Sequence, residues 1–491
     1  MKVTLSLWPP VVALAILACG APVRRDITPV RGSRVAGPVI DTLVLSAHAR
    51  FLSSDHLLGR RAGSSGAWVA AEYLAAACRT LGLTPVGGAD YFQPVPLLQL
   101  AITSARLEFT RNGGARVFHA PRDFVMDLGL SVTSFAGPVV YAPGSLDLAS
   151  LPPVAGSVVV TDAVLNRDLL DSLTAAGAAG LLLAVRDSQH YDLYVRSRGH
   201  TRLLLDQPET PSSLLRALPT ATLGPAASAA VLANAEGAES GPTGSRVRVD
   251  VDLERSAVPD RNVACLLRGT HSSARDTAVV LVAHYDHLGV GLPDQHGDSI
   301  YNGFSDNAAG VAMLLAIAQA FRDLRYAPLH SVVLLFMAAE EQGLLGSDYY
   351  AAHPRWPHDR TLGVINLDAG APPARPASWR LAGIPGSPIA LLATDVAHAQ
   401  GWSATVSRAT PNSDHYPFLR AGVPAVFIIP GPGPYQGMSV DSSRALRARW
   451  DHYHQPADAW APDFPLAGLG RYAEYAFLVA RALDRGVDQP R

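Results

Sequence analysis

The sequence predicts an α/β fold: a doubly wound, mixed but mostly parallel sheet flanked by helices, with a second, β-rich unit inserted into it. After Arg255 come four continuous apolar runs, which read "AVVLVAH", "SVVLLFMAAE", "LGVINLD" and "PAVFIIP". Such runs indicate strands that are buried on both faces. Helical stretches such as "AAGVAMLLAIAQAF" separate them, and this alternation is typical of a sheet that helices cover on both sides.

The N-terminal 19 residues predict an export signal. Lys2 precedes an apolar stretch that ends in "VVALAILACG", which is too short to span a bilayer. The three residues before Cys19 resemble the lipobox of bacterial lipoproteins, in which the cysteine becomes the acylated first residue; a plain secretory signal is the alternative. We therefore expect a periplasmic or cell-envelope lipoprotein, or a secreted protein, with membrane attachment only through an N-terminal lipid.

Two helices and a strand-rich region follow. The segments "DTLVLSAHARFLSSDHLLGR" and "GAWVAAEYLAAACRTLGL" have apolar residues near helical spacing, and a Gly/Ser turn joins them. From Phe92 to about Leu253 the pattern changes to short strand-like pieces, with "GSVVVTDA" and "AAGAAGLLLAV" among them. Cys78 and Cys265 fall on a helix-like and a strand-like segment, and we interpret both as small core residues, not as a disulfide framework.

Length and charge limit the classes of function. A chain of 491 residues is long enough for two or three domains. Its 40 lysines and arginines against 42 aspartates and glutamates leave a formal net charge of -2, so no overall field attracts nucleic acid or an acidic polymer. We therefore expect charge chemistry in one local site and no nucleic-acid partner.

Groups that can bind a metal follow three of the four apolar runs. His284 ends the first run, Glu340 and Glu341 follow the second, and Asp368 ends the third. In such sheets ligands gather at the carboxyl ends of the strands, so these side chains are expected to lie together. Imidazole and carboxylate groups are ligands that suit catalytic zinc.

Two more candidates, Asp306 and His454, complete a set of two imidazoles and three carboxylates, with one glutamate left over. Two divalent cations would bring four positive charges, which three carboxylates and one bridging hydroxide neutralise. Asp306, at the start of a helix, is the expected bridge between two zinc ions about 3.5–4 Å apart. Neighbouring residues cannot both enter one small coordination sphere, so we expect Glu341 to bind metal and Glu340 to transfer protons.

Each of these residues also has a simpler interpretation. Asp306 could cap a helix, the two glutamates could be solvated loop charges, and the other ligands could make ordinary hydrogen bonds or cap turns. Independent causes of that kind do not explain why three neighbouring strands all end in ligand-type groups, so we favour a shared site. Asp286 is expected to hold the ring of His284 by accepting from its second nitrogen; a turn aspartate is the alternative.

The motifs around these residues resemble the zinc aminopeptidase family, which also contains glutamate carboxypeptidases, glutaminyl cyclases and transferrin receptors. They cover the C-terminal half in the order "AHYDHLG", "NGFSDNAAG", "AAEEQGLLGS", "INLD", "SDHYPF" and "YHQPAD". In addition, "FLSSDHLLGRRAGSSGAWVAAEYL" resembles the N-terminal helices of the family, and "AAGAAGLLLAV" resembles its protease-associated domain. The resemblance implies a zinc exopeptidase-like fold, with a signal peptide at 1–19, peptidase-domain parts at 20–100 and 256–491, and a protease-associated insertion at 101–255.

The resemblance also implies roles for the candidate ligands. Two zinc ions are bound per chain, and Asp306 bridges them. Each ion takes two further ligands, which are His284 and Asp368 for one ion and Glu341 and His454 for the other. Glu340 is the general base, in agreement with the assignment from charge and position. The peptide bond between Asp306 and Asn307 is expected to be cis.

Four further residues are singled out by the same resemblance. Tyr453 matches a tyrosine that holds the carbonyl oxygen of the tetrahedral intermediate in some members; packing of its ring is the alternative. Asp414 and His415 resemble a pair that lies behind the ligands or beside the substrate. Ser305 stands where many members have a second acidic residue, and this removes a charge but no ligand.

The expected function is that of an exported zinc aminopeptidase that removes N-terminal residues from peptides. The main alternative is a carboxypeptidase or dipeptidase of the same family, which needs a cationic pocket, and Arg408, Arg420 and Arg444 are candidates for it. Glutaminyl cyclases act with one zinc ion, and a non-catalytic binding protein would have lost ligands, whereas all five are present. The insertion is expected to narrow access to the cleft and so to favour small peptides.

Overall fold

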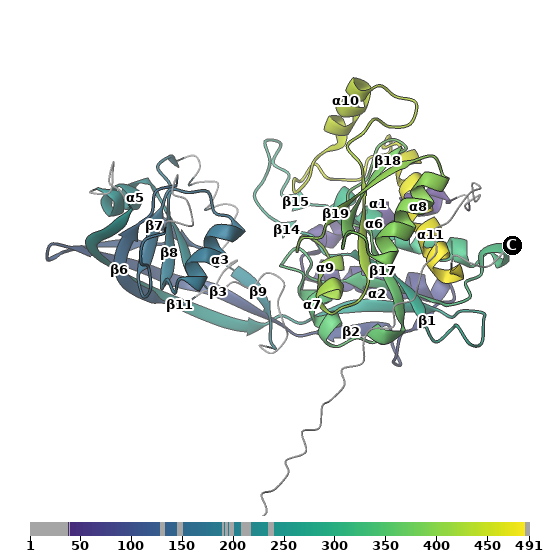
Figure 1. The fold of residues 1–491 in the computed structure, drawn as a ribbon, viewed down its shortest axis with the longest axis horizontal. Coiled ribbons are helices and arrows are strands. Elements are labelled where there is room, and N and C mark those ends of the chain that lie inside the picture. Colours follow the sequence, from purple (N-terminus) through teal and green to yellow (C-terminus); the bar gives the residue numbers. More distant parts are fainter. Residues whose placement is uncertain are drawn as a thin grey trace, which may run out of the picture.

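The computed structural model describes residues 38, 40–127, 133–144, 151–188, 191, 195, 201–207, 218–233 and 240–486. The predicted signal peptide, with Cys19, lies outside the described residues. The chain forms two lobes that lie side by side (Figure 1). We call residues 40–96 and 258–486 the main lobe and residues 97–257 the second lobe.

A nine-stranded mixed sheet forms the centre of the main lobe. Its strand order is β1-β12-β16-β13-β17-β20-β18-β19, and β2 pairs with β12. The bounds of these strands are β1 (Thr84–Pro85), β2 (Phe92–Val95), β12 (Asp260–Leu267), β13 (Ala278–His284), β16 (Ser331–Met337), β17 (Thr361–Asn366), β18 (Ser378–Gly383), β19 (Ser403–Arg408) and β20 (Ala425–Pro430). A short hairpin of β14 (Gly289–Val290) and β15 (Ile300–Tyr301) lies beside the sheet.

The four predicted apolar runs are the four central strands. The strands β16, β13, β17 and β20 are parallel neighbours. The strands β12 and β18, which flank this group, pair with it antiparallel, and parallel pairing returns only between β18 and β19. The mixed α/β fold is confirmed, but the sheet is parallel mainly in its centre. An apolar run does not show whether a strand pairs in parallel or antiparallel. The sequence analysis therefore overestimated how much of the sheet is parallel.

Helices cover both faces of this sheet. Their bounds are α1 (Thr42–Leu52), α2 (Ser65–Thr80), α6 (Ala309–Phe321), α7 (Leu345–Ala352), α8 (Pro388–Ala399), α9 (His415–Arg420), α10 (Val440–Trp450) and α11 (Ala467–Arg485). Side chains of α1, α2, α6, α8 and α11 pack on one face, and those of α7 and α9 on the other. In β13, Val279 and Leu281 enter the first core, whereas Val280 and Val282 enter the second. This double burial explains why the central strands are apolar at every position.

The segment Phe304–Phe321, which includes α6, is long and apolar enough to cross a membrane, with a mean hydropathy of 1.3. However, 83% of it is buried inside the protein. Its side chains pack between the sheet, α1 and α11, which is the setting of a core helix.

The two predicted N-terminal helices are α1 and α2. The side chains of Asp41 and Ser64 cap them by accepting from backbone N–H groups. Cys78 of α2 and Cys265 of β12 are fully buried, as expected of core residues, but they form a disulfide that the sequence did not predict. The two cysteines are 187 residues apart, and only the packing of α2 against β12 brings them together.

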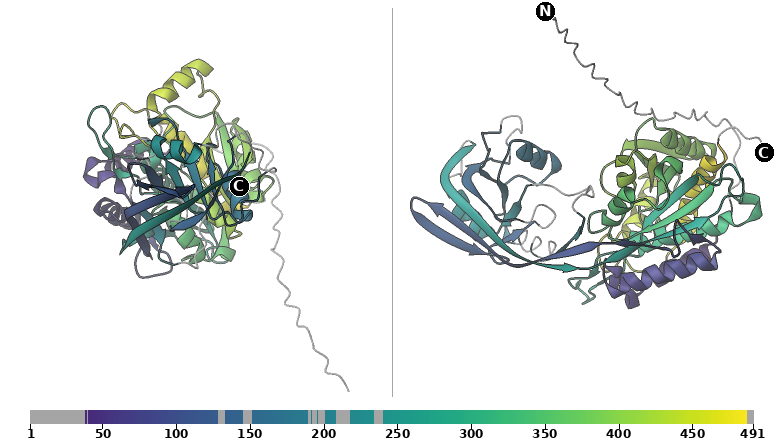
Figure 2. Two further views of the ribbon diagram at one scale, coloured as in Figure 1. Left: turned by 90° about the vertical axis from the view of Figure 1, so that its left-hand side faces the viewer. Right: turned by 90° about the horizontal axis from the view of Figure 1, so that it is seen from below.

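A second nine-stranded sheet forms the second lobe, in the order β4-β3-β11-β6-β7-β8-β10-β5, with β9 paired to β3. Its strands are β3 (Leu97–Arg111), β4 (Gly114–His119), β5 (Phe124–Met126), β6 (Phe135–Tyr141), β7 (Val158–Thr161), β8 (Gly180–Ala184), β9 (Thr201–Leu205), β10 (Thr220–Leu223) and β11 (Gly241–Ala257). The helices α3 (Arg167–Ala175) and α5 (Pro225–Leu232) pack on opposite faces. The long paired strands β3 and β11 extend through the second lobe to its junction with the main lobe (Figure 2).

Candidate metal centre

The carboxyl ends of three central strands meet at one edge of the main sheet. His284 is the last residue of β13, Glu340 and Glu341 follow β16, and Asp368 follows β17. These strands are parallel neighbours, so their ends lie on the same side. Nε2 of His284 is 2.8 Å from Oδ1 of Asp368. The sheet therefore brings together the side chains that stand at the ends of the apolar runs.

Asp306 lies between two histidines. It belongs to the segment Phe304–Ala308, before α6 begins. The side chain that accepts from the first turn of α6 is that of Asn307, not Asp306, so the helix-cap interpretation is wrong. Oδ1 of Asp306 is 3.2 Å from Nε2 of His284, and Oδ2 is 3.1 Å from Nε2 of His454. The peptide bond between Asp306 and Asn307 is cis, as expected. The two oxygens of one carboxylate thus face two imidazoles, which is the arrangement of a bridging ligand.

Glu341 is placed between two imidazoles as well. Its Oε2 atom is 3.2 Å from Nε2 of His454, and its Oε1 atom is 2.6 Å from Nδ1 of His287. The sequence reasoning missed His287, whose fully buried ring packs edge-on against that of His454 at 5.7 Å between centroids. The signal was present, because His287 is the second histidine of "AHYDHLG".

The donor atoms fit metal ions. Tetrahedral zinc with ligand bonds of about 2.0–2.2 Å holds its ligand atoms about 3.3–3.6 Å apart. The contacts of Nε2 of His284 and of His454 with the carboxylates measure 2.8 to 3.2 Å, so a small outward movement of these groups makes room for an ion. Nε2 of His454 is buried and lies 3.1 Å from a carboxylate oxygen of Asp306 and 3.2 Å from one of Glu341, so this nitrogen is shared between two carboxylates. Two triplets place their donor atoms within 4.8 Å of one another: His284, Asp306 and Asp368, and His287, Asp306 and Glu341.

Burial and hydrogen bonding shift the pKa values of the carboxyl groups in opposite directions. Burial raises the pKa of Glu340 well above its ordinary value. Burial also acts to raise the pKa of Glu341, but hydrogen bonds from His287 and His454 outweigh it and lower that pKa. The same balance lowers the pKa of Asp306. The two adjacent glutamates therefore differ: imidazoles hold the carboxylate of Glu341, whereas burial makes the carboxylate of Glu340 the stronger base.

The site opens into a cavity of about 290 Å³. Four of the predicted ligands and Glu340 lie on its wall, together with Ala369, Arg380, Asn412, Phe427, Ile429 and Tyr453. The ring of Tyr453 is 65% exposed and stacks on His454 at 3.8 Å between centroids. All these residues belong to the main lobe, and the narrowing of the cleft by the insertion stays a prediction.

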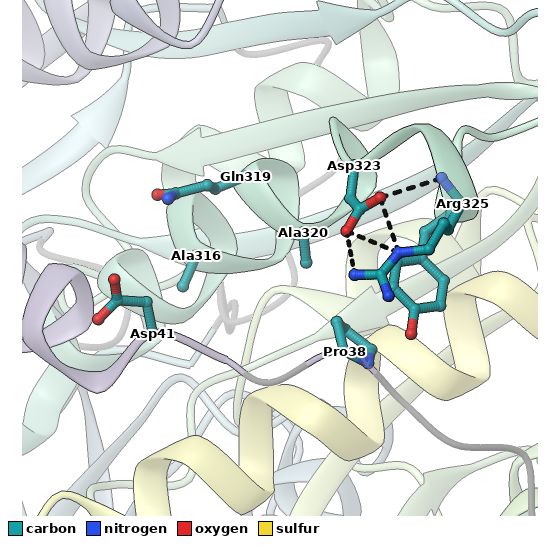
Figure 3. Close-up of a pocket in the computed structure, with 8 residues that line it drawn as sticks. Pro38, Asp41, Ala316, Gln319, Ala320, Asp323 and Arg325 are labelled. Carbon is teal, nitrogen blue, oxygen red and sulfur yellow. Dashed lines mark hydrogen bonds and ion pairs between the residues drawn. The ribbon is translucent and has the colours of Figure 1, made fainter.

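A larger cavity, of about 460 Å³, lies beside α6 (Figure 3). Its charged side chains are Asp41, which caps α1, and Asp323 and Arg325, which pair with each other. Convergent ionisable groups mark a functional cavity better than its size does. We therefore place the candidate site in the smaller cavity.

Asp286 acts on two neighbours. Its Oδ1 atom accepts from the backbone N–H of Glu340 at 3.0 Å. The expected hydrogen bond between this carboxylate and the ring of His284 is not formed, because 3.7 Å separate Oδ1 from Nδ1. Nδ1 lies instead 3.2 Å from the backbone carbonyl oxygen of Asp286. The residue thus fixes the ring through its backbone while its side chain fixes Glu340.

Asp414 and His415 are fully buried and are not on the cavity wall. Burial raises the pKa of Asp414 to about 7 and lowers the pKa of His415 to about 4. The preceding residue, Ser413, donates a hydrogen bond from its hydroxyl to Asp368. This segment therefore supports Asp368 from behind the cavity wall.

Asp458 connects two loops of the site, and the sequence reasoning gave it no role. Its carboxylate accepts from the backbone N–H groups of Ser305 and Asp306, while the residue itself lies four positions after His454. The hydroxyl of Ser305 accepts from the N–H of Ala371, in the loop after β17. Ser305, at the position where an acidic residue is common in the family that the sequence resembles, thus helps to hold the segment around Asp306 in place.

Arg60 supports the same loops from behind. Its guanidinium is 1% exposed and donates to the carbonyl oxygens of Tyr285, Asn302 and Gly303. Its own carbonyl oxygen accepts from the N–H of His287. Burial lowers the pKa of Arg60 to about 10, so the group remains a cation at neutral pH behind an acidic site. A charge that is fixed by main-chain carbonyls leaves no recognisable pattern in the sequence.

The geometry of the candidate site agrees with the known proteins to which the chain is similar. The model of peptidase family M28 matches residues 262–479. A probable zinc metalloprotease of Leptosphaeria maculans is 26% identical over 220 residues, which are 38% of this chain and 48% of that protein. A probable zinc metalloprotease of Pyricularia oryzae is 33% identical over 107 residues, which are 22% of this chain and 20% of that protein. The chain thus spans about half the length, or less, of these relatives.

Two solved structures share the fold. The aminopeptidase from Aneurinibacillus sp. strain AM-1 superposes with a TM-score of 0.56 and 16% identity, over 90% of this chain and 94% of that one. A zinc aminopeptidase from Bacillus subtilis superposes with a TM-score of 0.50 and 16% identity, over 91% and 95% of the two chains. At this identity the likeness shows the fold alone.

Proposed function

From the premise that residues 262–479 belong to peptidase family M28, we propose that the chain is an exported zinc aminopeptidase that removes N-terminal residues from peptides and binds two zinc ions. One observation carries the proposal. The two carboxylate oxygens of Asp306 face His284 and His454, and each of these histidines also contacts a second carboxylate. A carboxylate that only stabilises the fold needs contact with one histidine, not two.

The ligand sets follow from these contacts. Asp306 serves both ions, and each ion takes one further imidazole and one further carboxylate: His284 with Asp368, and His454 with Glu341. His287 is in a position to bind metal, but its hydrogen bond to Oε1 of Glu341 uses the Nδ1 atom that faces the site. We therefore assign His287 to holding the carboxylate of Glu341, with Oε2 directed towards His454.

Zinc in such a site lowers the pKa of a water molecule and polarises the carbonyl group of a substrate. Glu340 lies on the cavity wall, its carboxylate makes no hydrogen bond with another described residue, and Asp286 fixes its backbone. Its raised pKa suits a group that takes a proton from water and returns it to the leaving amine. Tyr453, on the same wall, would donate to the substrate oxygen that becomes negative.

The charges of the site favour a free amine as the group that the site binds. Four carboxylates line the cavity; three of them are assigned to the zinc ions, and the fourth, Glu340, is left to attract a protonated α-amine. The three arginines considered for a carboxylate pocket do not lie on the wall, whereas Arg380 does. Arg420 pairs with Asp348, and Arg444 pairs with Asp441.

The disulfide supports the proposed export. Disulfides persist in oxidising compartments and are rare in the cytosol, and the Cys78–Cys265 bond joins α2 to the sheet. The lipid anchor on Cys19 is a further proposal, as is the identification of the second lobe as a protease-associated domain. The parallel strands β6, β7, β8 and β10, between α3 and α5, support the latter by showing that this lobe has a core of its own.

The test is a hydrolysis assay with the purified full chain, before and after removal of metal by a chelator. We expect cleavage of peptides with a free amine, loss of cleavage after chelation, and recovery when zinc is added back. Equal cleavage of peptides whose N-terminus is blocked would contradict aminopeptidase action.

A further inference from the structure

Arg380 is the single arginine or lysine on the cavity wall among the residues that the structure describes. It lies in β18, where its neighbours Trp379 and Leu381 are buried in the helical core. Side chains alternate between the two faces of a strand, so Arg380 projects away from that core. Ile429 of β20 is its partner in the strand register and lies on the same wall. The sheet thus directs this cation into the cavity.

The guanidinium of Arg380 makes no hydrogen bond or ion pair with another described residue. Other arginines near this end of the sheet are engaged: Arg447 donates to the carbonyl oxygens of Gly431 and Gly433, and Arg420 pairs with Asp348. Arg380 shares its cavity with four carboxylates, but none of them pairs with it. An open guanidinium fork in a cavity is suited to binding a planar anion.

Asn412 offers a second donor on the same wall. It lies in the loop between β19 and α9, directly before Ser413, whose hydroxyl holds Asp368. Its side-chain amide has no hydrogen bond to another described residue. A guanidinium and an amide can together satisfy the oxygens of one carboxylate.

The inference deepens the proposed function and rests on it. We propose that Arg380, assisted by Asn412, forms a subsite for a carboxylate group of the substrate. The cavity of about 290 Å³ is at the lower end of the range for small-molecule sites, so the substrates are short. The carboxylate is either the C-terminal group of a dipeptide or an acidic side chain of the second residue.

Two matched pairs of substrates separate these sources. Ala-Gly against its C-terminal amide tests the terminal carboxylate, and Ala-Glu-amide against Ala-Gln-amide tests the side chain. We expect the native chain to favour the anionic member of one pair. Arg380→Gln should reduce that preference about 10- to 100-fold, mainly through KM, because a hydrogen-bonded charge pair is lost. Arg380→Lys should keep part of the preference.

Arg408→Gln is the matched control. Arg408 is an exposed arginine of the neighbouring strand β19, and it is not on the cavity wall. Its replacement should leave the preference unchanged. An equal preference in the native chain and in Arg380→Gln would overturn the inference.

A binding measurement separates the subsite from the proposed function. Zinc-loaded Glu340→Gln protein is titrated by calorimetry with Ala-Gly and with Ala-Glu-amide, with and without the additional change Arg380→Gln. We expect the affinity for one of the two peptides to fall about 10- to 100-fold with that change. If no substrate is hydrolysed by the native chain, the proposed function fails, and this titration still decides on the subsite. Equal affinities in the two proteins would overturn it.

Discussion

The two halves of the candidate metal centre are built from different kinds of structure. The inner half, His284 and Asp368, stands at the ends of two central strands, and its side chains are 1% and 9% exposed. The outer half, Glu341 and His454, includes a loop histidine that is 35% exposed. Side chains at the ends of packed strands have little freedom, whereas a loop residue depends on its neighbours for its position. We therefore expect the inner half to hold its ion more tightly.

The two halves also have different supports. In the inner half the Asp286 carbonyl oxygen lies beside the ring of His284, and the hydroxyl of Ser413 donates to Asp368. The outer half is fixed by residues from distant segments, which include His287 and the Asp458 carboxylate that connects its loop to the Asp306 turn. The comparison teaches that strand topology supplies His284, Asp368 and Glu341, whereas His454 has to be brought in by a loop.

Asp306→Asn should have the largest effect, because this carboxylate serves both halves. We expect loss of both zinc ions on dialysis and no measurable hydrolysis, and metal analysis with steady-state assays checks this. Asp323→Asn is the control, since Asp323 is a surface aspartate that pairs with Arg325. Two zinc ions retained in Asp306→Asn would show that it is not the bridge.

Glu340→Gln should leave both halves intact and remove the proton transfer between water and leaving group. We expect kcat to fall by about 10²–10⁴-fold with an unchanged zinc content. Glu341→Gln is the matched control, and it should lose the outer ion. If Glu340→Gln loses an ion and Glu341→Gln does not, the roles of the two glutamates are exchanged.

The comparison of the two halves can be tested with histidine variants at chelator concentrations that are too low to remove all of the metal. His454→Ala should keep one zinc ion, held by the inner half, whereas His284→Ala should lose the ion that the native chain holds more tightly. Native mass spectrometry counts the ions at each chelator concentration. The same affinity for the remaining ion in the two variants would remove the distinction between the halves.

His287→Ala should have the smallest effect of the changes considered. The ring holds Glu341 from behind, and loss of such a support lowers metal affinity by about 10–100-fold. We expect the weakening to be confined to the outer ion, as a competition titration with a metal indicator would show. Loss of the inner ion as well would mean that His287 supports the whole site.

The sequence predicted the inner half of the site better than the outer half, for a physical reason. Continuous apolar runs mark buried parallel strands, and the residues that end them must share an edge, so His284 and Asp368 could be placed together, and with them Glu341 of the outer half. His454 could be placed only by its motif. Arg60 and Asp458 were missed because they act through backbone groups of other loops, and the Cys78–Cys265 disulfide depends on packing over 187 residues.

The fold, like the site, could be predicted from the sequence only in part. The central strands were identified from their apolar runs, but the antiparallel pairing of β12 and β18 was not, because pairing direction is set by connections and not by side-chain pattern. Arg380 was also not singled out, since a lone arginine in a strand carries no signal until the register shows which face it is on. Such residues need three-dimensional context.

Diffraction recorded at the zinc absorption edge, on crystals of the zinc-loaded protein, tests the central claim most directly. We expect two anomalous peaks about 3.5–4 Å apart, one on each side of the Asp306 carboxylate, with the peak beside His284 the better occupied. A single peak, or two peaks that do not share Asp306, would contradict the proposed centre.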